Sequence, residues 1–179
     1  VALAFPREGG HEWPERFLNG ILELSEIHNL TMVGGDLART PHDEVSSLTV
    51  TGRVPAGEIC RRSGAVPGNL LYATGWYGSS LASGHHLTFA PRCREGRWLA
   101  AGGWTRTMID VSDGLLLDAA RLCRASGVSV ALVPGRVIKR TSQTTLENAL
   151  TDGEDYELLF AVHPEKSRAL EAGWPFDDV

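Results

Sequence analysis

Short apolar runs with the character of β-strands alternate with helical patterns along the sequence, and this alternation limits the folds open to the chain. Strands are predicted at six places: 30–33, 45–54, 70–74, 107–111, 128–133 and 156–162. Helices are predicted from the spacing of apolar residues over 13–28, 115–126 and 144–150, and from 164 to 172. Because strands that alternate with helices are typical of layered proteins, the sequence predicts an α/β or α+β layered fold.

A break at Pro55-Ala56-Gly57 interrupts this pattern. Proline and glycine end regular structure, and domain boundaries commonly fall in such stretches. We therefore expect two parts, residues 1–56 and residues 57–179. With 42% hydrophobic residues the chain can bury a real core. The chain starts at Val1 rather than Met and stops directly after a predicted helix, so we expect it to be a piece of a longer protein.

Composition and charge exclude several classes of protein. The net charge of −5 and the absence of a basic stripe argue against a nucleic-acid-binding surface. No apolar run approaches the length of a membrane span, and the first residues lack the basic start of a signal peptide. The scattered cysteines Cys60, Cys93 and Cys123 form no CxxC pair, which argues against structural zinc and favours a reducing compartment. We expect a cytoplasmic protein that binds neither nucleic acid nor membrane.

Acidic residues stand at places where predicted strands end, and the first is Asp36 in Gly34-Gly35-Asp36. The two glycines permit positive φ and a close approach of the backbone to a ligand. A carboxylate beside exposed amides suits a magnesium–phosphate group, since the amides meet the phosphate and the carboxylate meets the metal. The alternative is an ordinary turn in which Asp36 bonds to its own backbone.

Asp110 and Asp113 lie in the segment IDVSDGLL. Asp110 falls within an apolar strand, where an ionised carboxylate is unfavourable unless it is paired or bound to a metal. Asp113, together with Ser112, is placed to cap the N-terminus of the following helix. Capping and ligand binding are compatible, because a helix N-terminus also favours phosphate. Two carboxylates three residues apart can share magnesium ions with phosphate oxygens.

The segment DGEDYELLF (152–160) crowds four carboxylates before an apolar strand. Like charges packed together require counter-charges, such as Mg²⁺ or a cationic substrate. The alternative is a solvated acidic loop. Arg39, Arg61 and Arg62 suit phosphate oxygens, with ordinary surface arginines as the alternative. His85-His86 is interpreted as an exposed pair without metal-ligand spacing.

The sequence contains none of the common glycine-rich nucleotide or nucleophile motifs. There is no GxxxxGK[ST] loop, no GxGxxG after a strand and no GxSxG elbow. A nucleotide enzyme of this composition would hold phosphates through carboxylate-bound magnesium and glycine backbone.

Four segments together resemble the thiamine-monophosphate kinase family, within the aminoimidazole ribonucleotide synthetase-like superfamily. They are MVGGDLAR (32–39), RSGAVPGNLLYATG (62–75), DVSDGL (110–115) and DGEDYELLF (152–160). The last block is particular to the thiamine enzyme. The resemblance spans residues 13 to about 172, in order and with matching spacing.

This resemblance implies an ATP- and Mg²⁺-dependent enzyme that converts thiamine monophosphate to thiamine diphosphate. It implies that residues 1–56 are part of a truncated ATP-binding domain and that residues 57–179 are a truncated C-terminal α/β domain. It also implies a homodimer in the full-length form. Phosphate attacks phosphate directly, so no acid or base residue is required. The implied site consists of magnesium ligands at Asp36, Asp110 and Asp113, nucleotide contacts at Gly35, Asp36, Arg62 and Ser112, and a substrate contact at Glu154.

The sequence departs from the family pattern at several positions. Leu37-Ala38 replaces two threonines, Asp152 replaces a glycine, and the acidic step expected within residues 75–84 is missing. The family's N-terminal segment, which carries further aspartates, is also missing, so we expect this chain to be inactive alone. The alternatives are a selenophosphate or aminoimidazole ribonucleotide synthetase-like enzyme, or a non-catalytic nucleotide-binding paralogue.

Overall fold

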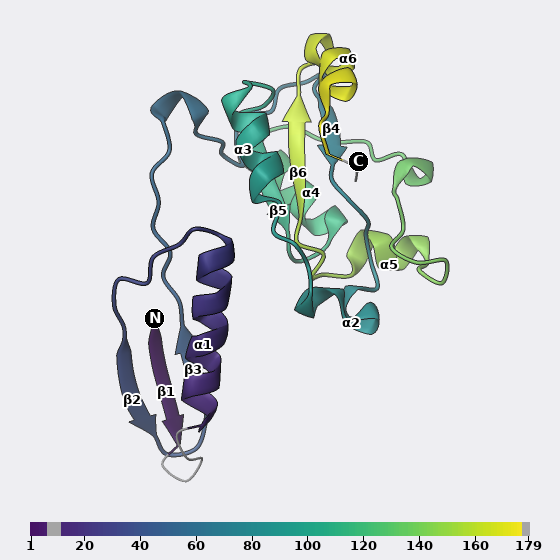
Figure 1. The fold of residues 1–179 in the computed structure, drawn as a ribbon. Coiled ribbons are helices and arrows are strands. Elements are labelled where there is room, and N and C mark those ends of the chain that lie inside the picture. The colour runs from purple at the N-terminus through teal and green to yellow at the C-terminus, as the bar shows by residue number, and fades with distance from the viewer. Residues whose placement is uncertain (7–11, 177–179) are drawn as a thin grey trace. The chain divides into compact units, whose positions relative to one another are not determined.

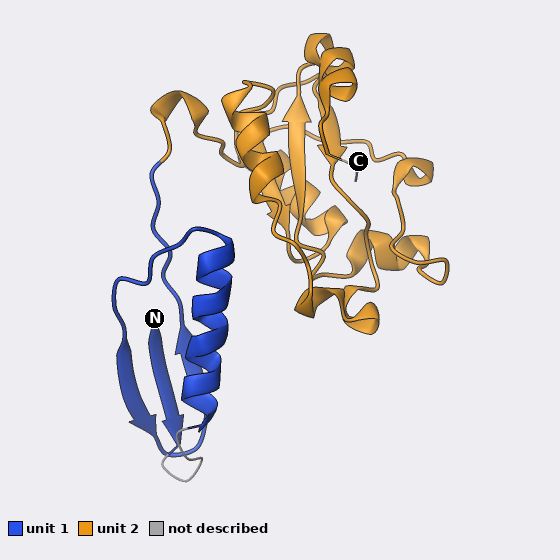
Figure 2. Cartoon of the chain, in the orientation of Figure 1, with its two compact units in different colours: residues 1–53 blue, residues 54–179 orange. Residues whose placement is uncertain are grey.

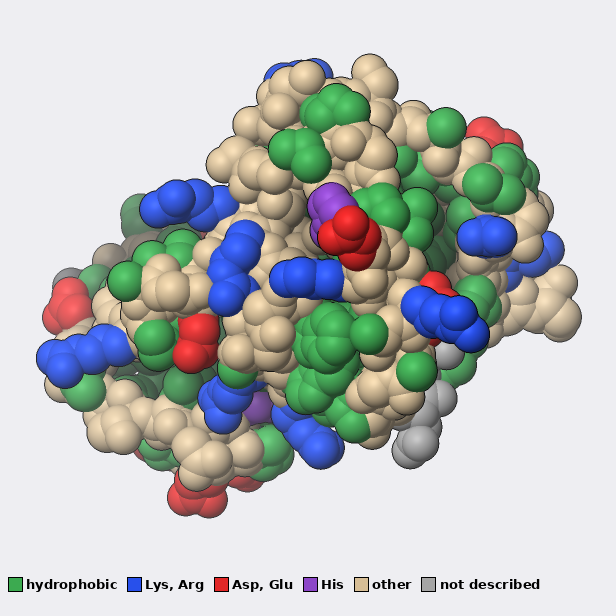
Figure 3. Space-filling model, turned by 90° about the horizontal axis from the view of Figure 1, so that it is seen from above, with side chains coloured by type: hydrophobic (Ala, Val, Ile, Leu, Met, Phe, Trp, Pro, Cys, Tyr) green, Lys and Arg blue, Asp and Glu red, His purple; other side chains and the backbone are tan. Residues whose placement is uncertain are grey.

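The computed structural model describes residues 1–6 and 12–176 (Figure 1). The chain divides into two compact units, residues 1–53 and residues 54–179, with the division beside the Pro55–Gly57 break (Figure 2). None of the helices in the described part is long and apolar enough to cross a membrane. Charged side chains of both signs are interspersed with hydrophobic ones on the face shown in Figure 3.

The first unit is a three-stranded sheet with one helix. Strand β1 (Ala2–Pro6) is central, parallel to β2 (Asp36–Thr40) and antiparallel to β3 (Val45–Ser47). Helix α1 (Glu12–Ile27) matches the predicted helix and lies along the sheet (Figure 1). Leu3 and Phe5 of β1 are buried in this unit.

The strand predicted at 30–33 is wrong, and the strand predicted at 45–54 is shorter than expected. Residues 31–35 and 48–55 form no strand, and β2 instead begins at Asp36. The physical reason for both differences is the way in which the strands of this sheet pair. The apolar start of the chain forms β1, which was not predicted, and β1 pairs Ala2 with Asp36. Residues without a partner strand cannot satisfy a ladder, whatever their propensity.

The second unit is built on an antiparallel sheet in the order β4-β6-β5. Its strands are β4 (Leu70–Ala73), β5 (Thr107–Val111) and β6 (Glu157–Val162), close to the predictions at 70–74, 107–111 and 156–162. Central β6 is buried along nearly its whole length. A central strand covered on both faces has a continuous run of apolar residues. For this reason the sequence predicted a strand in this segment.

Helices cover both faces of that sheet (Figure 1). The helices of this unit are α2 (Ser80–Ser83), α3 (Cys93–Ala101), α4 (Leu115–Ser126), α5 (Leu146–Thr151) and α6 (Pro164–Gly173). Leu159 of β6 belongs to a core cluster with Leu122 of α4 and Ala149 of α5. Phe160, on the opposite face, belongs to a second cluster with Leu99 of α3 and Leu170 of α6. The alternating residues of one strand therefore serve two separate cores.

The strand predicted at 128–133 is also wrong. These residues form no ladder within the described chain, and Val130 and Val133 are exposed. Residues 129–133 line one side of a cavity of about 560 Å³ whose other side includes β4. The segment has strand-like residues but pairs with no strand in the described part of the chain, so the local pattern alone does not produce a strand.

Helix α5 begins with a capping box. Thr145 Oγ1 accepts from Asn148 N at 3.0 Å, and Asn148 Oδ1 accepts from Thr145 N at 3.3 Å. Replacing Thr145 with alanine leaves a helix N–H without its acceptor, and we expect a loss of about 1 kcal/mol in unfolding free energy. Urea denaturation measures it. The control is Thr151→Ala in the same helix, whose hydroxyl only bonds back to Glu147 O at 2.9 Å. Equal losses in both variants would contradict the capping role.

Candidate functional site

Three segments that are distant in sequence meet at one end of the second unit's sheet. They are the turn after β4 (75–80), the turn after β5 (112–114) and the loop before β6 (152–156). Glu154 N donates to Ser112 O, and Tyr156 N donates to Val111 O, both at 2.8 Å. Ser79 N donates to Asp152 Oδ2 at 2.8 Å. Because β4 and β5 run antiparallel to β6, the C-terminal ends of both strands lie beside the start of β6.

Two glycines allow the second and third segments to lie against each other. Gly114 has φ +112°, and an added Cβ would come 2.9 Å from Thr151 O. An added Cβ on Gly153 would come 2.7 Å from Ser112 O. Any larger side chain would separate the two turns. The DGL and DGE sequences that suggested a ligand site therefore also have a packing role.

Asp110 lies near the end of β5 with its side chain exposed, in the burial pattern of an edge strand. The expectation that Asp110 is a buried carboxylate was therefore wrong. In a strand, alternate side chains point to opposite faces, and Asp110 points away from the core that holds Ile109 and Val111. Its exposed oxygens are free of protein packing and suit a hard cation such as Mg²⁺.

The predicted capping of α4 by Ser112 and Asp113 is also wrong. Gly114 occupies the cap position and provides no side chain. Asp118, inside the helix and almost fully buried, instead accepts from Ser112 N at 3.0 Å and from Asp113 N at 2.9 Å. Asp113 is left half-exposed and pairs with Arg121. The backbone of the 112–113 turn is therefore fixed by a carboxylate that the sequence did not single out.

Two carboxylates of the acidic segment, Asp155 and Glu157, are neutralised by partly buried arginines. Asp155 is fully buried, pairs with Arg140 at 2.9 Å and accepts from Gly78 N at 3.1 Å. Burial raises the pKa of Asp155, and the hydrogen bonds from Arg140 and Gly78 partly offset the rise. Glu157 is 2% exposed and accepts from Arg92 Nε at 2.7 Å. The prediction that metal or a cationic substrate neutralises the whole segment is corrected for these two residues, since protein cations do so.

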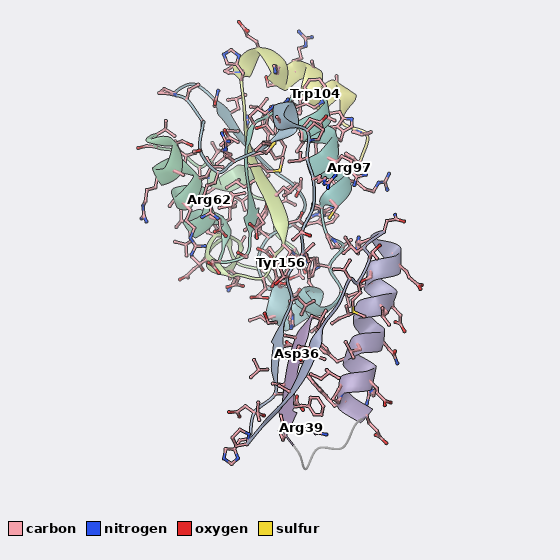
Figure 4. The ribbon with its side chains drawn as sticks, turned by 90° about the vertical axis from the view of Figure 1, so that its left-hand side faces the viewer. Asp36, Arg39, Arg62, Arg97, Trp104 and Tyr156 are labelled. Carbon is pink, nitrogen blue, oxygen red and sulfur yellow. The ribbon has the colours of Figure 1, made fainter. Side chains whose placement is uncertain are left out.

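Glu154 differs from Asp155 and Glu157 because no arginine faces it among the contacts of the described residues. Its carboxylate Oε2 accepts from the Tyr156 hydroxyl at 2.6 Å. Tyr156 lies against the end of β5, since its N–H donates to Val111 O. The pKa of its phenol is raised first by the hydrogen bond to Glu154, then by burial, and also by the charges of Glu154, Asp110 and Asp113. The structure thus brings Asp110, Asp113 and Glu154 to one surface around Tyr156, which is labelled in Figure 4.

In the first unit, Asp36 is exposed and begins β2 instead of ending a strand. Neither Gly34 nor Gly35 has positive φ, so the expected conformational role of these glycines is wrong. Gly35 has a packing role instead, since an added Cβ would come 2.6 Å from Val1 O. Arg39 lies over the Phe5 ring at 4.3 Å and donates to Pro6 O. Asp36 and Arg39 are labelled in Figure 4.

Arg62 is exposed, with its carbonyl bonded to Ser126 at 3.5 Å, and its guanidinium is available to an anion (Figure 4). His85 is half-buried and bonds to Asp155 O at 3.2 Å, so the prediction of an exposed histidine pair is wrong. In the described part of the chain, no three His, Cys, Asp or Glu side chains are grouped to hold a metal. Two carboxylates completed by substrate phosphates are nevertheless a common arrangement for Mg²⁺.

Sequence reasoning missed Arg92, Arg140 and Tyr156. Neither arginine lies in the acidic segment: Arg92 is 65 residues from Glu157 and Arg140 is 15 residues from Asp155, so no local pattern linked them to these carboxylates. Tyr156 had a local signal: it follows Glu154 by two residues in a segment already singled out.

Comparison with known proteins connects this arrangement to characterised relatives. No protein-family model matches the chain. Thiamine-monophosphate kinase of Rhodopirellula baltica is 33% identical over 181 residues, which cover 96% of this chain and 56% of that protein. The Escherichia coli K12 thiamine-monophosphate kinase is 32% identical over 195 residues, covering 94% of this chain and 58% of that protein. The chain spans a little over half the length of these curated relatives.

Solved structures agree on the fold. Thiamine-monophosphate kinase from Stenotrophomonas maltophilia superimposes with a TM-score of 0.74 at 23% identity, over 96% of this chain and 63% of that one. AaThiL complexed with AMPPCP and TMP superimposes with a TM-score of 0.69 at 21% identity, over 92% of this chain and 61% of that one. The neighbours also include HypE and PurL, so the predicted aminoimidazole ribonucleotide synthetase-like fold is confirmed. The chain is homologous to thiamine-monophosphate kinases, as the four sequence segments indicated.

Proposed function

We propose that this chain forms part of a thiamine-monophosphate kinase, which transfers the γ-phosphoryl group of ATP to thiamine monophosphate and yields thiamine diphosphate. The observation that carries the proposal is the convergence of Asp110, Asp113 and Glu154 on one surface of the second unit. The homologues are kinases of this substrate, and the neighbour AaThiL is complexed with AMPPCP and TMP.

Each residue has a role that its chemistry supports. Asp110 and Asp113 would hold Mg²⁺ through exposed carboxylate oxygens, and the ion would neutralise charge on the phosphates of ATP. The carboxylate of Glu154 would attract the positively charged thiazolium ring of thiamine monophosphate. Ser112, next to Asp113, would contact the nucleotide, as would Arg62 through its guanidinium fork.

The first unit would contribute to ATP binding. Asp36 would be a third magnesium ligand and Gly35 a contact to the nucleotide. The hydrophobic residues Leu37 and Ala38 follow Asp36 directly, so hydroxyl ligands at those two positions are absent. We further propose a cytoplasmic location and a homodimeric full-length form, as the resemblance implies.

A turnover assay tests the proposed function. The full-length protein, given ATP, Mg²⁺ and thiamine monophosphate, is expected to form thiamine diphosphate, measured by chromatography, and to lose this activity without Mg²⁺. The 179-residue chain alone is expected to form little or none, because the relatives it matches are nearly twice as long. Failure of the full-length protein to turn over would favour the non-catalytic paralogue. Robust turnover by the 179-residue chain would overturn the second expectation.

A further inference from the structure

Two residues of the 152–156 loop adopt the left-handed backbone conformation, although neither is glycine. Glu154 has φ +66° and Tyr156 has φ +53°. This conformation is disfavoured for side chains of their size, and it persists only where the surroundings enforce it. Here Glu154 N donates to Ser112 O, and the buried Ser80 hydroxyl donates to Glu154 O at 2.6 Å. The loop is therefore held by contacts on both sides of Glu154.

These two residues flank Asp155, which points into the protein toward Arg140 and Gly78. Glu154 and Tyr156 are half-buried, and their side chains meet outside that interior pair. Strained, over-determined backbone of this kind is found at sites where a side chain must be aimed. The arrangement aims one carboxylate inward for structure and another outward.

The ring of Tyr156 is itself fixed. It stacks on Phe89 with a centroid distance of 4.2 Å and an interplanar angle of 22°. Its backbone N–H is bound to Val111 O at 2.8 Å. Because both the ring face and the backbone of Tyr156 are held, its hydroxyl has a fixed position. Its distance of 2.6 Å from Glu154 Oε2 is typical of an O–H···O⁻ hydrogen bond.

We propose that Tyr156 is a positioning residue, whose hydroxyl holds the Glu154 carboxylate in the orientation that receives the cationic ring of thiamine monophosphate. The proposal rests on the proposed function. A glutamate side chain otherwise samples several rotamers, and binding would have to order it. If Tyr156 fixes the Glu154 side chain before thiamine monophosphate binds, binding is favoured without any contact between Tyr156 and the substrate. The phenol is protonated and can donate at neutral pH, because the ordinary pKa of a tyrosine is about 10.

Tyr156→Phe tests the idea, since it removes the hydroxyl and keeps the ring on Phe89. In the full-length protein we expect the KM for thiamine monophosphate to rise about fivefold to tenfold. The kcat and the KM for ATP should stay within about twofold. Tyr72→Phe is the matched control, because it removes a hydroxyl bonded to a different glutamate, Glu171, at 2.5 Å. That variant should leave all three constants unchanged.

A double-variant cycle separates positioning from direct contact. Glu154→Gln alone should raise the KM for thiamine monophosphate and spare that for ATP. Adding Tyr156→Phe to Glu154→Gln should have no further effect if Tyr156 acts through Glu154. Calorimetric binding of thiamine monophosphate, with the analogue AMPPCP present, should show the same pattern without turnover.

The possible results separate a failure of the positioning role of Tyr156 from a failure of the proposed kinase function. Additive effects of the two changes, or a Tyr156→Phe variant that binds like the unsubstituted protein, would overturn the positioning role alone. Equal losses in kcat, in both KM values and in melting temperature would also overturn it, by showing a structural role. If the unsubstituted protein does not bind thiamine monophosphate at all, the proposed function falls, and the inference falls with it.

Discussion

Asp110→Asn in the full-length protein is expected to lower turnover about a hundredfold or more, with the fold unchanged. The substitution keeps the side-chain shape and removes the negative charge that would hold Mg²⁺ against the phosphates of ATP. Loss of such charge stabilisation typically costs a few kcal/mol in the transition state. Because Asp110 is exposed, its neutralisation relieves no buried charge, and the unfolding free energy should change by less than about 0.5 kcal/mol. Steady-state kinetics at saturating Mg²⁺ and urea denaturation measure the two quantities.

The same substitution at two further aspartates, Asp36 and Asp113, provides a comparison with Asp110→Asn. Asp36→Asn, in the first unit, should lower turnover comparably. Asp113→Asn should lower turnover while stability moves little, because the Arg121 pair that it breaks lies at the surface. An exposed acidic residue without a proposed role, Glu147 of α5, provides the control as Glu147→Gln. If Asp36→Asn and Asp110→Asn both behave like Glu147→Gln, the magnesium assignment is wrong.

Arg140→Met is expected to destabilise the second unit by about 3–5 kcal/mol at neutral pH, because it leaves the fully buried Asp155 carboxylate without its cation. Urea unfolding followed by tryptophan fluorescence reports on this unit through the stacked Trp98–Trp104 pair. Arg97→Met, at an exposed arginine of α3, is the matched control and should change stability by less than about 0.5 kcal/mol.

The pH dependence of the Arg140→Met effect has a definite sign. Burial already raises the pKa of Asp155 in the folded protein, and loss of Arg140 removes an interaction that lowers it. A carboxyl with a raised folded pKa binds a proton more readily in the folded than in the unfolded state. The destabilisation is therefore full above the folded pKa and shrinks as the pH falls through it. A loss of stability that does not shrink as the pH is lowered from 8 toward the ordinary pKa of an aspartate, about 4, would contradict this account.

The double variant Arg140→Met/Asp155→Leu keeps this prediction testable if the single variant does not fold. It removes both charges, and replacement of a buried pair by hydrophobic residues is often neutral for stability. Recovery of most of the lost stability would identify the unpaired carboxylate as the cause. A double variant as unstable as Arg140→Met would point to lost packing instead.

The second unit's secondary structure was predictable where a segment's own pattern determines its state. The apolar strand 107–111 and the amphipathic helix that follows it are both present with the expected bounds. Segments 30–33 and 128–133 have equally strand-like residues and form none. A strand requires a partner in register, and that partner is specified by distant residues, so a local pattern cannot supply it.

In the candidate site, too, some features could be predicted from local sequence and others depend on residues elsewhere in the chain. Asp36 was singled out because it follows two glycines, Asp110 because it falls within an apolar strand, and Asp113 because it precedes a predicted helix. The role of Glu154 came from the family resemblance. What the sequence could not show was which carboxylates face inward. Asp155 and Glu154 are adjacent, yet the first pairs with Arg140 and the second with Tyr156. Arg140, which decides this for Asp155, lies outside the acidic segment, 15 residues earlier in the chain.

The strand order β4-β6-β5 has a consequence for how the protein is made. The central strand of this sheet is the last of the three to leave the ribosome, and the earlier two pair with it and not with each other. Until Val162 has emerged, β4 and β5 have no sheet to join, and the apolar surfaces of α3 and α4 have no strand between them. Long-range pairing of this kind is slow and leaves apolar surface open to aggregation. Nascent chains that stall before β6 should therefore depend strongly on chaperones, whereas those that have passed it should not.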